Sequence, residues 1–88
     1  MSDLTFSDQA WRDYQYWQIQ DRKTLKRINL LIQSIQRDGP ANGIGKPEHL
    51  KYASGWSRRI DEKNRLLYEL RGENIYISAC LGHYNDEK

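Results

Sequence analysis

The fold is decided by the stretch Trp56-Ser-Arg-Arg-Ile-Asp-Glu-Lys-Asn-Arg-Leu-Leu-Tyr-Glu-Leu70, followed by a turn and then by Ile75-Tyr-Ile-Ser-Ala-Cys-Leu-Gly-His-Tyr84. Its interruptions at 61–64 and 71–74 are rich in the Asp, Asn and Gly typical of turns. We therefore predict three strands joined by two turns. A small sheet has no structural need for so many arginines beside a closing His-Tyr pair, so we expect its cationic side to bind nucleic acid.

The turns also set the register of the predicted strands, because side chains alternate between the two faces of a sheet. One face is then apolar, and its residues are Ile60, Leu66, Tyr68, Leu70, Ile75, Ile77 and Ala79. Arg59, Arg65 and Leu67 share the other face. Strict alternation places His83 on the apolar face. It reaches the arginine face only if the strand bulges or ends near Gly82, which a glycine permits.

Two helices are predicted before the hairpins. A short strand at 3–6 leads to Ser7, a good N-cap, and to a helix that runs to about residue 20. Aromatic residues at helical spacing on this helix favour a core face over a base-stacking surface, and they are Tyr14 and Trp17, with Ala10 in line and Trp11 beside them.

The second helix is predicted from Arg22 to about Arg37. Asp21 caps its start, and Gly39-Pro40 ends it, because proline cannot continue a helix. Its apolar face is formed by Leu25, Ile28, Leu31, Ile32 and Ile35. We expect an α+β fold in which two N-terminal helices pack on one face of a twisted antiparallel sheet. The loop 41–47 has two glycines but lacks the pattern of a phosphate-binding loop, so it is interpreted as a connector.

The chain as a whole fits one domain, residues 1–88, with 38% hydrophobic and 30% charged residues. Its single cysteine, Cys80, excludes an intramolecular disulfide framework, and two histidines argue against a zinc cage, so we expect no metal or cofactor. The sequence has no long apolar run and no apolar core of a signal peptide. We therefore expect a cytoplasmic protein with no membrane partner.

Charge is distributed unevenly, although the formal net charge is only +2. The segment 22–37 has five cations and no anion. Such a local field attracts polyanions, but it is equally typical of a solvated helix face, and the sequence leaves both interpretations open.

Ionisable residues near the predicted open face suggest strand scission of RNA. One group must take the proton of the ribose 2′-hydroxyl, and a second must protonate the departing 5′-oxygen; Glu48 and His83 are candidates. Arginines such as Arg59 and Arg65 can hold and stabilise the phosphate. Each also has an ordinary interpretation: Glu48 and Lys51 as solubilising charges, Arg65 as a partner of Glu69 or Asp61, and His83 as an exposed histidine.

The order of several motifs resembles the Txe/YoeB toxins, bacterial members of the RelE superfamily. The motifs are Trp11-Arg-Asp-Tyr-Gln-Tyr-Trp17, Gly45-Lys-Pro-Glu-His-Leu-Lys51, Gly55-Trp-Ser-Arg-Arg-Ile60, Asn64-Arg-Leu-Leu-Tyr68 and His83-Tyr84. The resemblance spans nearly the whole chain and implies a RelE/YoeB-like microbial RNase fold. Two features depart from the family pattern: Leu81 stands where a basic residue is frequent, and residues 85–88 follow the tyrosine at which many members end.

The resemblance also implies residue roles. Glu48 corresponds to the proposed general base, Arg65 to the arginine that stabilises the scissile phosphate, and His83 to the general acid, with Tyr84 as its aromatic partner. Lys51 and Arg59 correspond to basic residues that line the RNA cleft. His49 and Arg58 correspond to no catalytic position.

The implied function is that of a toxin that cleaves messenger RNA on the ribosome by metal-independent acid–base transesterification and is neutralised by a YefM-type antitoxin. Operator DNA would be bound only indirectly, through the antitoxin. Two alternatives stay open: a module that binds ribosomal RNA and blocks translation without cutting, and an inactive homologue that acts with the antitoxin as a DNA-binding repressor.

Overall fold

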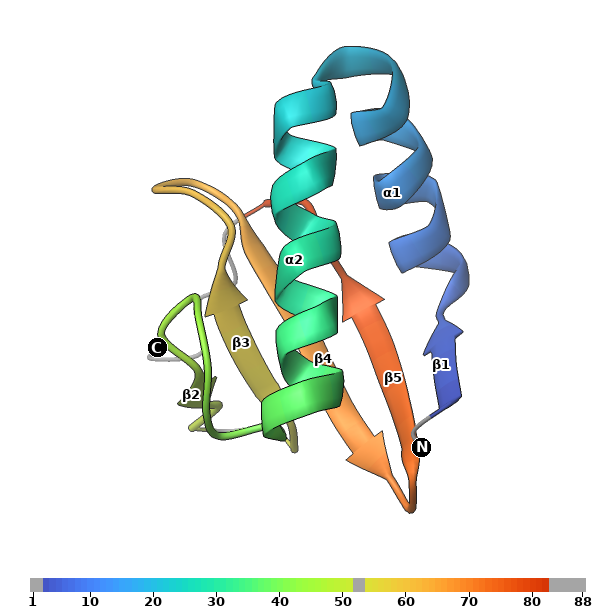
Figure 1. Cartoon of the computed structure of the whole chain (residues 1–88). Coiled ribbons are helices and arrows are strands. Elements are labelled where there is room, and N and C mark those ends of the chain that lie inside the picture. The colour runs from blue at the N-terminus through green and yellow to red at the C-terminus, as the bar shows by residue number, and fades with distance from the viewer. Residues whose placement is uncertain (1–2, 52–53, 83–88) are drawn as a thin grey trace.

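Two helices cover one face of a five-stranded sheet in the computed structural model, which describes residues 3–51 and 54–82 (Figure 1). The elements are β1 (Asp3–Phe6), α1 (Asp8–Gln20), α2 (Arg22–Asp38), β2 (Glu48–His49), β3 (Trp56–Arg59), β4 (Arg65–Arg71) and β5 (Asn74–Ala79). The strands lie in the order β1-β5-β4-β3-β2. The predicted α+β fold, with both helices on one side of the sheet, is confirmed.

One strand pairing differs from the expected antiparallel arrangement: β1 runs parallel to β5. The two strands are joined through both helices and the rest of the sheet, so no hairpin turn forces them to be antiparallel. In the parallel register, Leu4 lies beside Ile75 and Phe6 beside Ile77, which directs the apolar side chains of β1 toward the helices. The sheet is therefore mixed.

The caps of both helices form as the sequence predicts. The Ser7 hydroxyl accepts a hydrogen bond from the Ala10 N–H at 3.0 Å, and Asp21 accepts from the N–H groups of Lys23 and Thr24. Hydrogen bonds from Thr24 lower the pKa of Asp21. Helix α2 ends at Asp38, and Gly39 follows with a φ of 89° that glycine adopts readily. These local contacts fix where each helix starts and stops.

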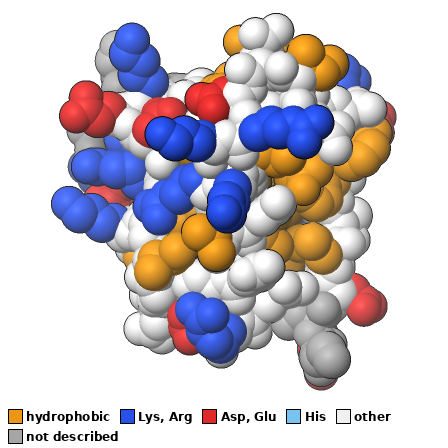
Figure 2. Space-filling model, turned by 45° about the horizontal axis from the view of Figure 1, so that its top comes forward, with side chains coloured by type: hydrophobic (Ala, Val, Ile, Leu, Met, Phe, Trp, Pro, Cys, Tyr) orange, Lys and Arg blue, Asp and Glu red, His pale blue; other side chains and the backbone are white. Residues whose placement is uncertain are grey.

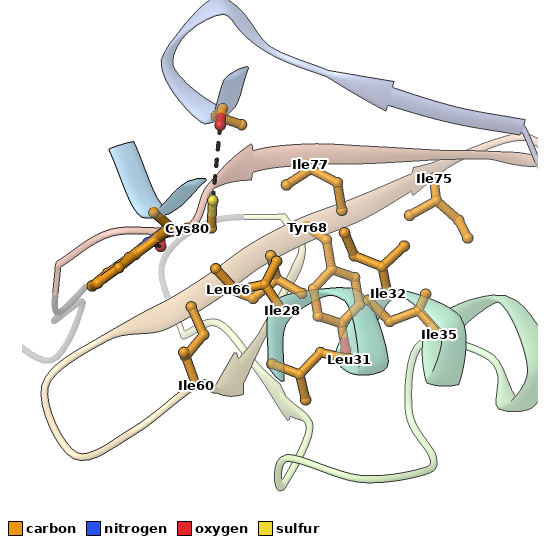
Figure 3. Close-up of a cluster of buried hydrophobic side chains, with 12 residues drawn as sticks. Ile28, Leu31, Ile32, Ile35, Ile60, Leu66, Tyr68, Ile75, Ile77 and Cys80 are labelled. Atoms are coloured by element: carbon orange, nitrogen blue, oxygen red, sulfur yellow. Dashed lines mark hydrogen bonds between the residues drawn. The ribbon is translucent and has the colours of Figure 1, made fainter. Parts of the chain in front are cut away.

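The core lies between the helices and the sheet (Figure 3). Its buried residues are Ala10, Trp17, Ile28, Leu31, Ile32, Ile35, Ile60, Leu66, Tyr68, Ile75, Ile77 and Cys80. Of the predicted members, Leu70 and Trp11 lie outside it, with 44% and 50% of their surface exposed, whereas Tyr14 and Leu25 are partly buried and pack against it. Leu70 is near the turn between β4 and β5, which extends beyond the end of α2 and is therefore left uncovered (Figure 1).

A β-bulge interrupts the pairing of β4 with β5. Leu67 lies opposite Ala79 and Tyr68 opposite Ile77, so Ser78 is an extra residue in β5. Beyond the bulge, Cys80 is fully buried whereas Ala79 is only half-buried. The prediction that Ala79 faces the core is therefore wrong, because the alternation shifts at Ser78.

The placement of His83 on the apolar face assumed that side chains alternate between the two faces without interruption after Ile77. The bulge at Ser78 interrupts this alternation. Gly82 adopts a φ of 94°, and its carbonyl accepts a hydrogen bond from the Arg65 N–H at 3.0 Å. The described chain thus ends beside the start of β4. His83 and Tyr84 lie outside the described residues.

Arg58 is a fully buried cation in the middle of β3. Its guanidinium donates to the Tyr68 hydroxyl at 2.8 Å and to the Ser34 hydroxyl at 2.9 Å. It also donates to the backbone carbonyls of Gly39, Pro40, Asn42 and Ile44. Because every donor has a partner, the buried guanidinium is tolerated and ties the loop after α2 to the sheet.

Replacing Arg58 is expected to destabilise the protein strongly. Arg58→Ala removes the common donor of the loop carbonyls and leaves a cavity, so we expect the free energy of unfolding to fall by about 3 kcal/mol or more. Arg59→Ala is the matched control, since the neighbouring Arg59 is exposed, and its effect should stay within about 0.5 kcal/mol. Urea denaturation followed by tryptophan fluorescence measures both; equal losses would contradict the structural role of Arg58.

Cys80 is held in a closed environment at the end of β5. Its N–H donates to the buried Asp13 carboxylate at 3.0 Å, and its carbonyl accepts from the Trp17 indole at 2.8 Å. The thiol faces the Ala10 carbonyl across the contact drawn in Figure 3. Burial, together with the charge of Asp13, raises the pKa of Cys80 to about 12. The thiol is therefore protonated and unreactive at neutral pH.

The Cys80 thiol should react with a disulfide reagent such as Ellman's reagent far more slowly in the native protein than in guanidinium chloride at the same pH. Between pH 7 and pH 9 the native rate should remain low, since the thiol ionises only near pH 12 in the folded state. The absorbance of the released thiolate measures the rate, and rapid native labelling would show that this part of the core opens readily.

Candidate functional site

Four polar side chains are brought together on the sheet face that the helices leave uncovered. Glu48 of β2 lies directly opposite Ser57 of β3, and Arg59 of β3 lies directly opposite Arg65 of β4. Ser57 and Arg59 are two residues apart, so both point away from the buried Arg58 between them. The pairing of three short strands therefore groups residues that are far apart in the sequence.

These four residues and Lys46 line a small polar cavity of about 60 Å³. It contains three cations, Lys46, Arg59 and Arg65, and a single carboxylate, Glu48. Within residues 3–51 and 54–82, the ion pairs closer than 4.0 Å join Arg37 to Asp38 and Arg71 to Glu69, and neither involves this cavity. The cavity therefore has an excess of unneutralised positive charge, which suits an anionic ligand.

Arg65 is held by the turn that precedes β4. Its guanidinium donates to the Asp61 carbonyl at 2.7 Å and to the Asn64 carbonyl at 3.1 Å. Burial of the Asp61 carboxylate acts to raise its pKa, but hydrogen bonds from Asn64 and Lys63 prevail and lower it. The ionised carboxylate thus stabilises the turn that orients Arg65.

The contacts of Glu69 and Asp61 distinguish the alternative roles of Arg65. Glu69 is paired with Arg71 at 2.6 Å, so it is not the partner of Arg65. Asp61 accepts the hydrogen bond of Arg65 through its backbone carbonyl, and the charge of Arg65 also helps to lower the pKa of the Asp61 carboxylate. Arg65 thus forms no ion pair closer than 4.0 Å within the described residues, and its charge acts both on Asp61 and on the cavity.

The remaining predicted site residues lie elsewhere or outside the described part. Lys51 is exposed in the bend after β2 and does not line the cavity. His83 and Tyr84 lie outside the described residues. Gly82, the last described residue, donates its N–H to the Asn64 side chain at 2.8 Å. The structure therefore brings together Glu48, Arg59 and Arg65 of the predicted set.

Sequence reasoning missed three residues near the site. Ser57 was identifiable, since strand alternation puts it on the same face as Arg59. Arg58 was identifiable as a buried cation, because alternation puts it on the same face as Ile60, yet it was assigned no role. The sequence gives no indication that Lys46 lies at the site, because the loop that carries it was interpreted as a connector. Its backbone φ of 52° depends on contacts with distant parts of the chain.

A second cationic surface lies along α2, where Arg22, Lys23, Lys26 and Arg27 follow one another. Figure 2, viewed toward the helical end, shows Lys and Arg side chains gathered with a few acidic ones between them. The Arg27 guanidinium donates to the Arg59 carbonyl at 3.1 Å. The cationic surface of α2 thus reaches β3 beside the cavity.

Metal-binding clusters and membrane-spanning helices are both absent from the part of the chain that the structure describes. No group of three or more His, Cys, Asp or Glu side chains there is arranged to hold a metal ion. None of the described helices has the length and apolar character needed to cross a membrane.

The cavity combines two chemical capacities. A carboxylate can accept a proton from a hydroxyl group, and neighbouring cations can stabilise the negative charge that develops on a phosphate during displacement. Both capacities are available at one place, because Glu48 and the three cations line the same small cavity.

Comparisons with known proteins agree on one family. The model of the YoeB-like toxin of bacterial type II toxin–antitoxin systems matches residues 6–84. Toxin YoeB of Synechocystis sp. is 47% identical over 83 residues, covering 92% of this chain and 95% of that protein.

Solved structures of YoeB from Staphylococcus aureus have the same fold. The YoeB dimer superimposes with a TM-score of 0.88 at 46% identity, covering 94% of this chain and 98% of that chain. The toxin in a YoeB–YefM complex gives a TM-score of 0.87 at 44% identity, covering 96% of this chain and 99% of that chain. Both likenesses therefore extend over the whole fold.

Proposed function

Because the chain belongs to the YoeB-like toxins of bacterial type II toxin–antitoxin systems, we propose that it is a ribosome-dependent endoribonuclease that cleaves messenger RNA and so inhibits translation. The observation that carries the proposal is the cavity in which the Glu48 carboxylate lies among three cations without an ion pair. An RNA phosphate would supply the missing negative charge, and its ribose hydroxyl would supply a proton for the carboxylate to accept.

The proposed reaction is an acid–base transesterification. Glu48 takes the proton of the ribose 2′-hydroxyl, whose oxygen then attacks the adjacent phosphorus. The bond from phosphorus to the 5′-oxygen breaks, and His83 protonates that oxygen as it departs. The upstream product ends in a 2′,3′-cyclic phosphate. In this proposal the two side chains carry out both proton transfers, and no metal ion or cofactor takes part.

The other site residues support these two proton transfers. Arg65 stabilises the charge that accumulates on the phosphate oxygens, and Arg59 holds the same phosphate from the neighbouring strand. Tyr84 stacks on a base beside the scissile bond. Lys51 contacts the RNA backbone outside the cavity. The cations of α2 dock on ribosomal RNA, where phosphate contacts give salt-sensitive binding without sequence choice.

Substitutions in the cavity should separate catalysis from folding. Expression of the wild-type protein without an antitoxin should arrest growth, and Glu48→Gln should slow cleavage of ribosome-bound message about 10²- to 10⁴-fold while leaving the Tm unchanged. Lys63→Gln, an exposed lysine outside the cavity, is the matched control and should remain toxic. Growth curves and a cleavage assay measure both effects. Undiminished toxicity of the Arg65→Ala, His83→Ala double variant would exclude the catalytic assignment.

Two competing functions give different results in the same cells. A protein that binds ribosomal RNA without cutting it would arrest growth but leave message ends unchanged. An inactive homologue that only joins an antitoxin in DNA binding would leave growth unaffected. Primer extension on a defined message distinguishes them, because new 5′-ends within the reading frame appear only with cleavage.

We further propose a YefM-type antitoxin as partner, since the S. aureus relative has been solved as a YoeB–YefM complex. An antitoxin segment that covers the cavity would need acidic residues to match its cations. The toxin would reach operator DNA only through the antitoxin. Because ribosomes and message are the proposed targets, the protein would act in the cytoplasm.

Charge reversal should locate the antitoxin interface. We expect Arg59→Glu combined with Arg65→Glu to weaken antitoxin binding at least about 100-fold, because two attractive contacts become repulsive. The pair Arg22→Glu and Lys23→Glu on α2 is the control of equal charge change and should bind nearly as the wild type does. Isothermal titration calorimetry measures both; the opposite ranking would place the interface on α2.

A further inference from the structure

Lys46 is the cavity residue for which neither strand pairing nor family resemblance gives a role. It lies in the loop between α2 and β2 and lines the cavity with Glu48, Arg59 and Arg65. It forms no ion pair closer than 4.0 Å within the described residues. Its ammonium group is therefore available to a ligand that enters the cavity.

The backbone of Lys46 is unusual. Its φ of 52° makes it the one non-glycine residue in the left-handed region among residues 3–51 and 54–82. Glycines occupy this region at two nearby positions of the same loop, Gly43 and Gly45. A glycine at position 46 would adopt the conformation without steric cost, whereas a lysine does not. Non-glycine residues in such conformations concentrate at functional sites.

The position of Lys46 is fixed by the residues around it. The Gly45 carbonyl accepts a hydrogen bond from the Arg59 N–H at 2.6 Å. A β-carbon on Gly45 would lie 2.6 Å from the Leu31 side chain, so the loop packs directly on the core. Arg58 holds the Ile44 carbonyl just before it. Lys46 thus extends from an anchored backbone, so the position of its α-carbon at the cavity is fixed.

We propose that Lys46 binds an RNA phosphate in this cavity, as a third cation beside Arg59 and Arg65; the proposal rests on the function proposed above. Arg59 and Arg65 form a cross-strand pair between β3 and β4, whereas Lys46 lies two residues before Glu48. The register that pairs Glu48 with Ser57, together with the Arg59 N–H bond to the Gly45 carbonyl, places Lys46 next to Arg59. The three cations therefore form a row across neighbouring segments, with Glu48 beside it. This arrangement holds the RNA backbone while Glu48 receives the proton of the 2′-hydroxyl.

Three variants test the role. Lys46→Gly removes the charge and also relieves the left-handed backbone, so its Tm should equal or exceed that of the wild type. Lys46→Arg keeps the charge and should keep the function. Lys63→Gln is the matched loss of one charge outside the cavity.

The measurement is the affinity of the purified toxin for a single-stranded RNA oligonucleotide that is fully 2′-O-methylated and therefore uncleavable. The Kd is determined by fluorescence anisotropy at several salt concentrations. Loss of one phosphate contact should weaken binding of Lys46→Gly about tenfold at low salt and reduce the slope of log K against log salt by about 0.7. Lys46→Arg and Lys63→Gln should retain the wild-type slope.

Cleavage of ribosome-bound message by the same variants separates this proposal from the general one. If the wild type cleaves and Lys46→Gly binds RNA with unchanged affinity and slope, the role of Lys46 is refuted while the endoribonuclease survives. If the wild type leaves the message intact, the proposed function fails, and the binding experiment still decides whether Lys46 contacts phosphate. An equal loss of slope in Lys63→Gln, or no measurable binding by the wild type, would also refute the role of Lys46.

Discussion

The buried guanidinium of Arg58 is the interaction on which the rest of the molecule depends. Its N–H groups donate to carbonyls of the loop that follows α2 and also to the Tyr68 and Ser34 hydroxyls. The guanidinium therefore connects this loop to β4 and to α2. Gly43 is required beside it, because a β-carbon there would lie 2.1 Å from the Ser34 oxygen. Without this anchor, the loop that leads to Lys46 and Glu48 would keep the backbone bond between Arg59 and Gly45 but lose the contacts that hold its first half. A residue that touches no ligand thus determines where the ligand-facing residues lie.

Strands β3 and β4 contribute to both the interior and the cavity. In β3, Arg58 points inward and its neighbours Ser57 and Arg59 point outward; in β4, Leu66 is buried while Arg65 lines the cavity. Because successive side chains alternate between faces, the apolar packing that fixes the strands also fixes the spacing of the cations. The cavity therefore needs no separate scaffold.

Local chemistry made much of the fold predictable. The caps at Ser7 and Asp21, the stop at Gly39 and the turns around β4 depend on nearby residues, and each formed where the sequence predicted it. The bulge at Ser78, the parallel pairing of β1 and the left-handed backbone of Lys46 depend on contacts between distant segments, which periodicity does not encode. Alternation placed Arg59 and Arg65 correctly on one face, but the small cavity they share with Lys46 arises only from the path of the loop.

The parallel pairing of β1 with β5 has a consequence for biosynthesis. Thr5 and Asn74, which are hydrogen-bonded across these strands, belong to opposite ends of the described chain. Strand β1 therefore has no partner until β5 has been made. Such a long-range closure makes folding slow relative to local hairpin formation and delays completion of the sheet. Until β5 has been synthesised, β1 stays separate from the other strands, and the five-stranded sheet cannot be completed.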